Sequence, residues 1–193
     1  MATIGLRDLF RAPITTNADG TETYGTPVRM AKAIQAQISV TTAEAKLFAD
    51  DSVDQQVKEF VSGTLTLGIN DLAPSEQAIV LGQTQDADGR IVAGEDDIPP
   101  YQAIGFRARK MGGRYKYIWL YKTKFAIPDE NYQTKGDSIA FNTPTIVGTF
   151  IKRPDGKWKI DYVGTPDDPV ASEWFEAVQE AAEAPPDPGG SDD

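Results

Sequence analysis

The most regular alternation of apolar and polar residues lies between Pro99 and Val163. From Tyr101 to Met111, one side is apolar and the other carries arginines, with Ile104, Phe106 and Ala108 set against Arg107 and Arg109. A period of two residues is typical of a half-buried β-strand. The pattern therefore predicts a strand that ends at the glycine pair 112–113.

A second alternating run extends from Tyr115 to Phe125 and contains most of the aromatic residues of this region. One predicted face holds Tyr115, Tyr117, Trp119, Tyr121 and Phe125, and the other holds Lys116, Ile118, Leu120, Lys122 and Lys124. Aromatic residues are favoured in strands because they pack well on a pleated surface. The two runs together predict a long hairpin whose aromatic face lies in a core.

Two further strands are predicted after this hairpin. The first lies within Ser138 to Arg153, and Pro154-Asp155-Gly156-Lys157 follows it as a strong turn signal. The closing strand has Trp158, Ile160 and Tyr162 on one face. The simplest arrangement is a meander of four strands from Tyr101 to Val163.

The N-terminal half predicts three more strands. Val28 to Val40 alternates as one long strand whose apolar face is interrupted by Lys32. Ala43 to Asp50 is predicted to return beside it and to end at Asp50-Asp51-Ser52. Gly63 to Asn70 alternates again, with Leu65, Leu67 and Ile69 predicted to point inward.

Capping signals predict two helices. Pro74 to Leu81 has proline at its start and Gly82 where a C-terminal cap belongs, which favours a short helix that covers the sheet. Gln83 to Pro100 is predicted to be a loop with a small hairpin at Asp88-Gly89. A second helix is expected to begin at a capping Asp168 and to present the apolar stripe Val170, Trp174, Phe175, Val178 and Ala182.

Length and composition indicate one domain of 193 residues with extensions. Residues 1–27 lack a sustained period and are predicted to form an N-terminal arm, 28–163 form the β-domain, and 164–193 form an acidic helix with a disordered tail. The absence of cysteine and histidine removes disulfides, thiolate metal sites and the commonest catalytic base. No signal peptide or membrane span is recognised, so we expect the protein to be made and kept in the cytoplasm.

Charge is unevenly distributed along the chain. Pro99 to Ala126 contains no acidic residue and seven basic ones, namely Arg107, Arg109, Lys110, Arg114, Lys116, Lys122 and Lys124. Gly164 to Asp193 contains nine acidic residues and no basic one, so the rest of a chain with net charge −10 is nearly neutral. The C-terminal segment is the obvious partner within the sequence. We expect the seven basic residues to form a subunit interface with an acidic surface of a neighbouring copy.

The sequence contains no motif of a known catalytic or cofactor site. Glu95-Asp96-Asp97 could hold a pair of catalytic carboxylates, but a solvated acidic loop is the more frequent case. Asp86-Ala87-Asp88-Gly89 resembles the start of a calcium loop, yet Arg90 stands where another oxygen ligand is needed. The basic hairpin suits nucleic acid, although its aromatic residues are expected in a core. We therefore predict no enzyme activity, no cofactor and no metal.

The order of these segments resembles the major tail proteins of long-tailed bacteriophages, in the group called the phi13 or TP901-1 type. The resemblance covers roughly Ala31 to Val163. It is carried by Ala45-Lys46-Leu47-Phe48-Ala49-Asp50-Asp51-Ser52-Val53, by Gly63-Thr64-Leu65-Thr66-Leu67-Gly68-Ile69, by Leu81-Gly82 after the short helix, and by the aromatic strand Tyr115 to Phe125. Residues 164–193 are not part of the pattern.

The resemblance implies a mainly β protein with flanking helices, a β-sandwich or partial barrel of the phage tail-tube type with extended arms. Such subunits assemble into rings, typically of six, and stacked rings form a tube through which DNA passes. The resemblance thus implies a structural virion protein of the tail, assembled in the host cytoplasm, with itself and other tail proteins as partners. The alternative is a monomeric β-sandwich that binds a ligand such as carbohydrate through exposed aromatic residues.

Overall fold

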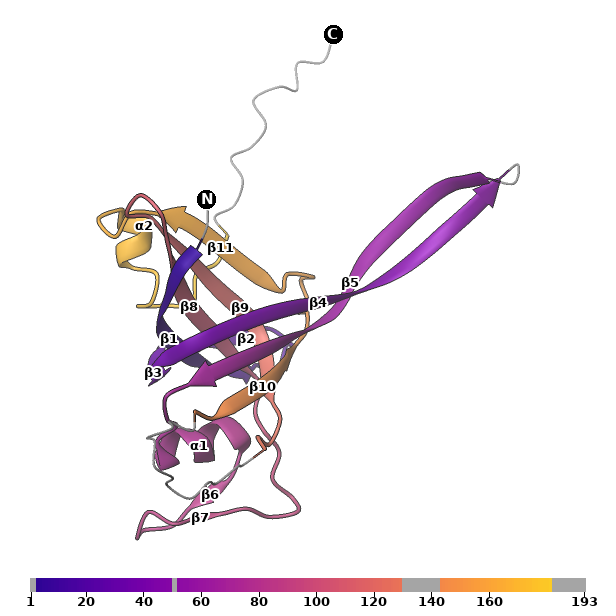
Figure 1. Cartoon of the computed structure of the whole chain (residues 1–193). Coiled ribbons are helices and arrows are strands. Elements are labelled where there is room, and N and C mark those ends of the chain that lie inside the picture. Colours follow the sequence, from indigo (N-terminus) through magenta and orange to yellow (C-terminus); the bar gives the residue numbers. More distant parts are fainter. Residues whose placement is uncertain (1–2, 50–51, 130–142, 182–193) are drawn as a thin grey trace, which may run out of the picture.

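A computed structural model describes residues 3–49, 52–129 and 143–181 (Figure 1). The chain is mainly β, as predicted, and its main antiparallel sheet has nine strands in the order β2-β1-β8-β9-β10-β5-β4, with β3 beside β1 and β11 beside β9. The strands are β1 (Thr3–Thr16), β2 (Glu22–Tyr24), β3 (Val28–Ala31), β4 (Ala33–Ala49), β5 (Ser52–Ile69), β6 (Thr84–Gln85), β7 (Ile91–Val92), β8 (Gln102–Lys110), β9 (Tyr115–Phe125), β10 (Thr145–Phe150) and β11 (Lys159–Gly164), and the helices are α1 (Pro74–Leu81) and α2 (Pro169–Ser172).

The sheet curls around one apolar core without closing into a barrel. The strand β3 pairs with β1, while β4, which follows it after Lys32, is the last strand of the sheet. The core inside the curl holds Leu9, Met30, Leu65, Leu67, Ile69, Val80, Leu81, Ile104, Phe106, Ile118, Leu120, Phe125, Ile146 and Phe150. The inward positions predicted for Leu65, Leu67 and Ile69 are confirmed, since each side chain is 0–1% exposed.

The N-terminal segment is a strand of the sheet, so the prediction of an arm over residues 1–27 was wrong for Thr3–Thr16. The strand β1 pairs with β8 along most of its length, and Leu9 and Ala12 are fully buried. Its alternation is hidden by two register shifts and by Asp8, which adopts a left-handed φ of 56°. A bulge inserts a residue and reverses the side that following residues face, which removes the period of two.

The strands β4 and β5 form one long hairpin. The expected strand Val28 to Val40 is divided at Lys32, because β3 pairs with β1 and β4 pairs with β5. The return predicted at Ala43 was wrong, since β4 continues to Ala49 and β5 begins at Ser52. Beyond Thr42 and Phe60 the hairpin projects from the body as a two-stranded ribbon (Figure 1).

A bulge in β9 changes the predicted aromatic face. Gln102 pairs with Thr123 and Ile104 pairs with Leu120, so β9 has one more residue than β8 in this interval. Tyr117, Trp119 and Tyr121 therefore lie in a second core on the outer face of the sheet, whereas Phe125 lies in the core inside the curl. The prediction that Phe125 shares the face of the other aromatic residues was wrong for this reason.

The last strands do not form the predicted meander. The strand β10 pairs with the end of β9 at Thr123 to Phe125 and with β5, whereas β11 returns to the first half of β9 at Tyr115 to Leu120. The turn at Pro154 to Lys157 is confirmed by the hydrogen bond from the Arg153 N–H to the Lys157 carbonyl. Trp158 packs against the inner core, while Ile160 and Tyr162 pack against the outer one. The start of the third predicted strand, from Ser138, lies outside the described residues.

The first helix and the loop after it match the predictions. The helix α1 begins with Pro74 and ends at Gly82, which has a φ of 69°. An added Cβ there would lie 2.3 Å from the Ile98 carbonyl oxygen, so the position requires glycine. The short strands β6 and β7 form the hairpin predicted at Asp88-Gly89.

The second helix is shorter than predicted. The carboxylate of Asp168 caps it as expected, accepting from the Val170 N–H at 3.1 Å, but α2 ends at Ser172 after one turn. Within the predicted stripe, Trp174 and Val178 are buried and Phe175 packs against the outer core, whereas Val170 is 45% exposed. Ala182 and the predicted disordered tail lie outside the described residues.

Candidate assembly surfaces

Four of the seven predicted interface residues have partners within the subunit. Arg107 forms a salt bridge with Asp8 at 2.5 Å, and Lys116 forms one with Asp161 at 2.8 Å. Lys122 donates to Glu22, and Arg114 donates to the Val163 carbonyl at 3.1 Å. Much of the charge on this hairpin is therefore compensated by β1, β2 and β11.

The acidic C-terminal segment is not the partner of the basic hairpin in the described part of the chain. Each carboxylate that pairs with the hairpin precedes Gly164, and within 164–181 it is Glu180 that forms a salt bridge, with Arg153. The expectation that charge compensation within the sequence comes from residues 164–193 was thus wrong for 164–181. That prediction paired the two segments by their opposite charge alone, and charge does not indicate which segments the fold brings together.

The three remaining basic residues, Arg109, Lys110 and Lys124, lie at the two ends of the hairpin. Arg109 and Lys110 precede the glycine turn, and Arg114 follows it. We call Arg109, Lys110 and Arg114 the basic tip; Arg109 and Arg114 are exposed, and none of the three forms a salt bridge with the described residues, although Arg114 donates to the Val163 carbonyl. Lys124 lies at the other end, 5.6 Å from the centroid of the Tyr101 ring. The structure therefore separates the predicted interface into a middle that pairs with carboxylates of the same subunit and a tip that has no carboxylate partner among the described residues.

Residues 168–181, here called the C-terminal strap, cover the aromatic outer face formed by β1, β9 and β11. Trp174 is 1% exposed and packs on Tyr117 and Tyr162, and Phe175 stacks on Phe10 with ring centroids 4.6 Å apart. The body holds the strap by its main chain, since Trp119 donates to the Trp174 carbonyl at 3.0 Å. The strap therefore buries a surface that would otherwise be a large exposed apolar patch.

Arg153 fastens the far end of the strap. Its guanidinium donates to Asp155 and, at 2.6 Å, to Glu180, and it lies 4.4 Å from the centroid of the Tyr121 ring. The hydroxyl of Tyr121 in turn donates to the Gln179 carbonyl at 3.0 Å. Burial raises the pKa of both Tyr24 and Tyr121 to about 12, and the neutral Tyr24 hydroxyl accepts from Arg153 at 3.3 Å.

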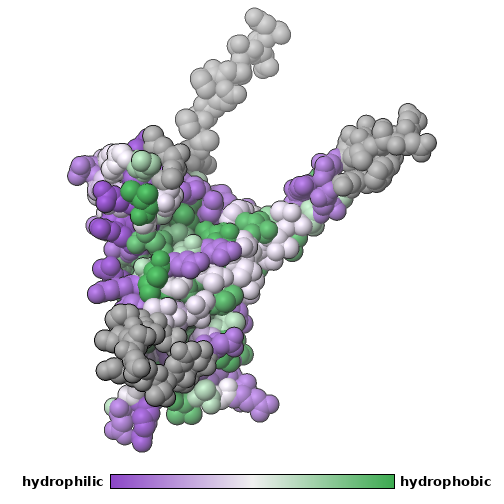
Figure 2. Space-filling model, in the orientation of Figure 1, coloured by the Kyte–Doolittle hydropathy of each residue, from purple (hydrophilic) through white to green (hydrophobic). Residues whose placement is uncertain are grey.

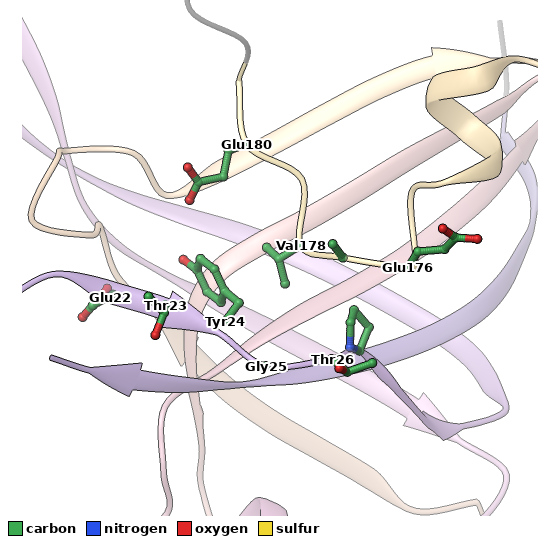
Figure 3. Close-up of a pocket in the computed structure, with 10 residues that line it drawn as sticks. Glu22, Thr23, Tyr24, Gly25, Thr26, Glu176, Val178 and Glu180 are labelled. Carbon is green, nitrogen blue, oxygen red and sulfur yellow. The ribbon is translucent and has the colours of Figure 1, made fainter.

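A shallow acidic hollow lies between the strap and β2 (Figure 3). Its volume is about 490 Å³, and its walls include Glu22, Tyr24, Thr26, Glu176, Val178 and Glu180. The Glu22 side chain is 4% exposed, and its oxygen Oε2 has no hydrogen-bond partner among the described residues. Glu176 is exposed and forms no salt bridge with the described residues. The hollow thus has acceptor groups that the described residues do not fully use.

The outer edge of β4 is open. In the described structure β4 pairs with β5 and with no other strand, and from Ala33 to Ala43 it contains no charged residue and no proline. The valines Val40, Val57 and Val61 are 46–51% exposed at or near the projecting ribbon. The space-filling view shows apolar and neutral surface extending from the body along this hairpin (Figure 2). Sequence reasoning predicted a strand here but missed its open edge, for which the absence of charge was the available signal.

The other sequence candidates have ordinary structural roles. Asp86 and Asp88 both bind Arg90, with contacts of 2.6 and 2.7 Å. Asp97 accepts from the Gly94 N–H within an exposed loop. Among the described residues no group of acidic side chains is arranged to hold a metal ion. Tyr117, Trp119 and Tyr121 are buried beneath the strap, so they do not form the exposed platform that carbohydrate binding requires.

Comparison with known proteins does not assign the chain to a family. No protein-family model matches it, and no curated protein is significantly similar to it. No helix in the described segments has the length and apolar content needed to cross a membrane.

Proposed function

We propose that this protein is a structural subunit that polymerises into stacked rings and forms the tail tube of a long-tailed bacteriophage. The observation that carries the proposal is the open, uncharged edge of β4 from Ala33 to Ala43. Edge strands of monomeric proteins are usually short or protected by lysine, proline or bulges, because an exposed edge pairs with other chains. A long neutral edge is expected in a subunit whose function is to be paired.

The projecting ribbon supports the same proposal. The part of β5 that precedes Gly63 pairs with β4 alone, whereas the part from Gly63 onward also pairs with β10. The outer parts of β4 and β5 therefore lack a second neighbouring strand in the described structure. An isolated two-stranded hairpin is marginally stable in water, and stability normally requires more strands or a packed face. In a ring, the ribbon of one copy would lie against the next copy, which would supply both additional strands and a face to pack on. The assembly is therefore expected to order a segment that the single subunit supports poorly.

The resemblance to phage major tail proteins supplies the particular assembly. It implies rings, typically hexameric, whose inner strands form a continuous barrel, with DNA passing only as cargo. The net charge of −10 agrees with such a channel, because a strongly basic lumen would bind phosphates and retard DNA. Other tail proteins would be the further partners at the ends of the tube, and the location would be the virion.

Lysine substitutions at the β4 edge test the proposal. Gln37 and Ser39 are exposed on the polar face of β4, and their cross-strand partners Thr66 and Thr64 lie on the same face of β5. Gln37→Lys with Ser39→Lys is expected to prevent assembly, because charged side chains at an edge oppose strand pairing. Sedimentation and negative-stain electron microscopy of concentrated protein would measure it.

The matched control is Thr64→Lys with Thr66→Lys, which adds the same charges between β4 and β10, where no edge exists. This control should still assemble, and circular dichroism should show that both variants are folded. The proposal is wrong if wild-type protein remains monomeric at high concentration with other tail proteins present. It is also wrong if the edge variant assembles as well as the control.

A further inference from the structure

No salt bridge joins the basic tip to the acidic hollow within the described subunit. The tip flanks Gly112 and Gly113, whose φ values of 82° and 77° form the turn between β8 and β9. One wall of the hollow is at Tyr24, which packs against Tyr121, whereas Glu176 on another wall follows Phe175, which packs on Tyr117, three residues after Arg114. In the described subunit the tip does not pair with Glu176, and Arg114 donates to the Val163 carbonyl, so tip and hollow are both available to another copy.

The tip is suited to contact another chain. Arg109 and Arg114 are exposed on either side of the turn Met111-Gly112-Gly113, and the Arg114 guanidinium uses one donor for the Val163 carbonyl. Arg107, two residues earlier, is held by Asp8, whereas the tip has no carboxylate partner among the described residues. A guanidinium presents five N–H donors in a fixed plane and binds carboxylates in a directed manner.

The hollow offers matching acceptors. Glu22 and Glu180 are each engaged by a cation of the same subunit, Lys122 and Arg153 respectively. Glu176 remains exposed on its wall without a salt bridge to the described residues, and Oε2 of Glu22 has no partner there. Tyr24, with its phenol kept neutral, adds an aromatic ring beside these carboxylates (Figure 3). A basic side chain placed here would supply donors that the described part of the subunit lacks.

We propose that the basic tip of one copy docks in the acidic hollow of the next copy, with Glu176 as the principal acceptor. The contact joins different surfaces of two identical chains, so each bound copy still offers a free tip and a free hollow. Such head-to-tail contacts close into rings or continue as filaments. This inference rests on the proposed self-assembly and names a polar contact that sets its direction, separate from the β4 edge.

Charge reversal and its rescue test the contact. Arg114→Glu and Glu176→Arg, each alone, place like charges opposite one another and should raise the protein concentration at which assembly begins by about tenfold or more. The chain carrying both substitutions should assemble within about threefold of wild type, because the pair is restored with its signs exchanged. The measurement is sedimentation over a concentration series, with particle shape checked by electron microscopy.

Two substitutions serve as controls. Glu173→Arg reverses another exposed acid of the strap that does not line the hollow, and Lys152→Glu reverses an exposed cation away from the tip. Both should assemble like wild type. If the single reversals assemble normally, or if the combined chain is not rescued, the contact is wrong while the proposed self-assembly stands. If wild type forms no assembly under any condition, the proposed function itself fails.

Discussion

Arg153 shows how one residue connects segments that are distant in sequence. Its side chain is 8% exposed, yet it contacts Asp155 in the turn before β11, Glu180 of the strap, and the rings of Tyr24 and Tyr121. A buried cation is tolerated only where partners replace the water that it has lost. Here two carboxylates and two aromatic faces serve this purpose, so the arginine links β2, β9 and the strap.

Replacing Arg153 with alanine should lower the free energy of unfolding by about 2 kcal/mol, because it leaves two carboxylates and a phenol without their shared donor. The loss should be smaller than for a fully buried ion pair, because Asp155 and Glu180 are 40% and 57% exposed and water can hydrate their carboxylates. Urea denaturation would measure the change. Lys157→Ala, which removes an exposed cation 3.6 Å from Asp155, is the control and should cost less than about 0.5 kcal/mol. Equal losses in the two variants would mean that Arg153 has no special role.

Among the elements, the strap has the least regular backbone and buries some of the largest side chains. After Ser172 it has no strand or helix up to residue 181, but Trp174 and Val178 are anchored in the outer core. The Trp119 indole N–H donates to the main-chain carbonyl of Trp174. This hydrogen bond depends on where the strap's backbone lies and not on which side chain the strap residue carries. Two apolar anchors and a few hydrogen bonds therefore hold the strap in place of a helix.

Trp174→Ala should reduce the free energy of unfolding by about 3 kcal/mol, because a fully buried indole is lost and a cavity remains. Val170→Ala is the control within the same segment, since Val170 is 45% exposed, and it should cost less than about 1 kcal/mol. Thermal denaturation followed by circular dichroism would compare the two. If Trp174→Ala is as stable as the control, the strap is not anchored by its tryptophan.

The sequence predicted the elements that obey simple periods and missed those that bulges disturb. Leu65, Leu67 and Ile69 alternate without interruption, and Gly82 ends a helix with a standard cap, so both were predicted correctly. The strand β1 and the inward position of Phe125 were missed, because each depends on an inserted residue that reverses the alternation. The partners of the basic hairpin could not be predicted either, because only the strand order of the sheet brings Asp8, Glu22 and Asp161 next to it.

On the scale of the molecule, the described surface divides into a covered face and an open edge. The strap covers the outer aromatic face, and α1 contributes Val80 and Leu81 to the core inside the curl. By contrast, the β4 edge has neither a neighbouring strand nor a protecting charge from Ala33 to Ala43. A fold that covers its apolar faces and leaves one long neutral edge free directs association to that edge.

Hydrogen exchange should locate the edge pairing directly. In the free subunit, the outward amides of Ala33 to Ala43 have no acceptor among the described strands and should exchange rapidly, whereas those of β9, paired on both sides, should be protected. On assembly, the β4 amides should slow by at least about tenfold, because neighbouring main-chain carbonyls replace water as their acceptors. Peptide-level mass spectrometry would compare 33–43 with 115–125 in the two states. Assembled particles whose 33–43 amides exchange as fast as in the free subunit would show that the copies associate through another surface.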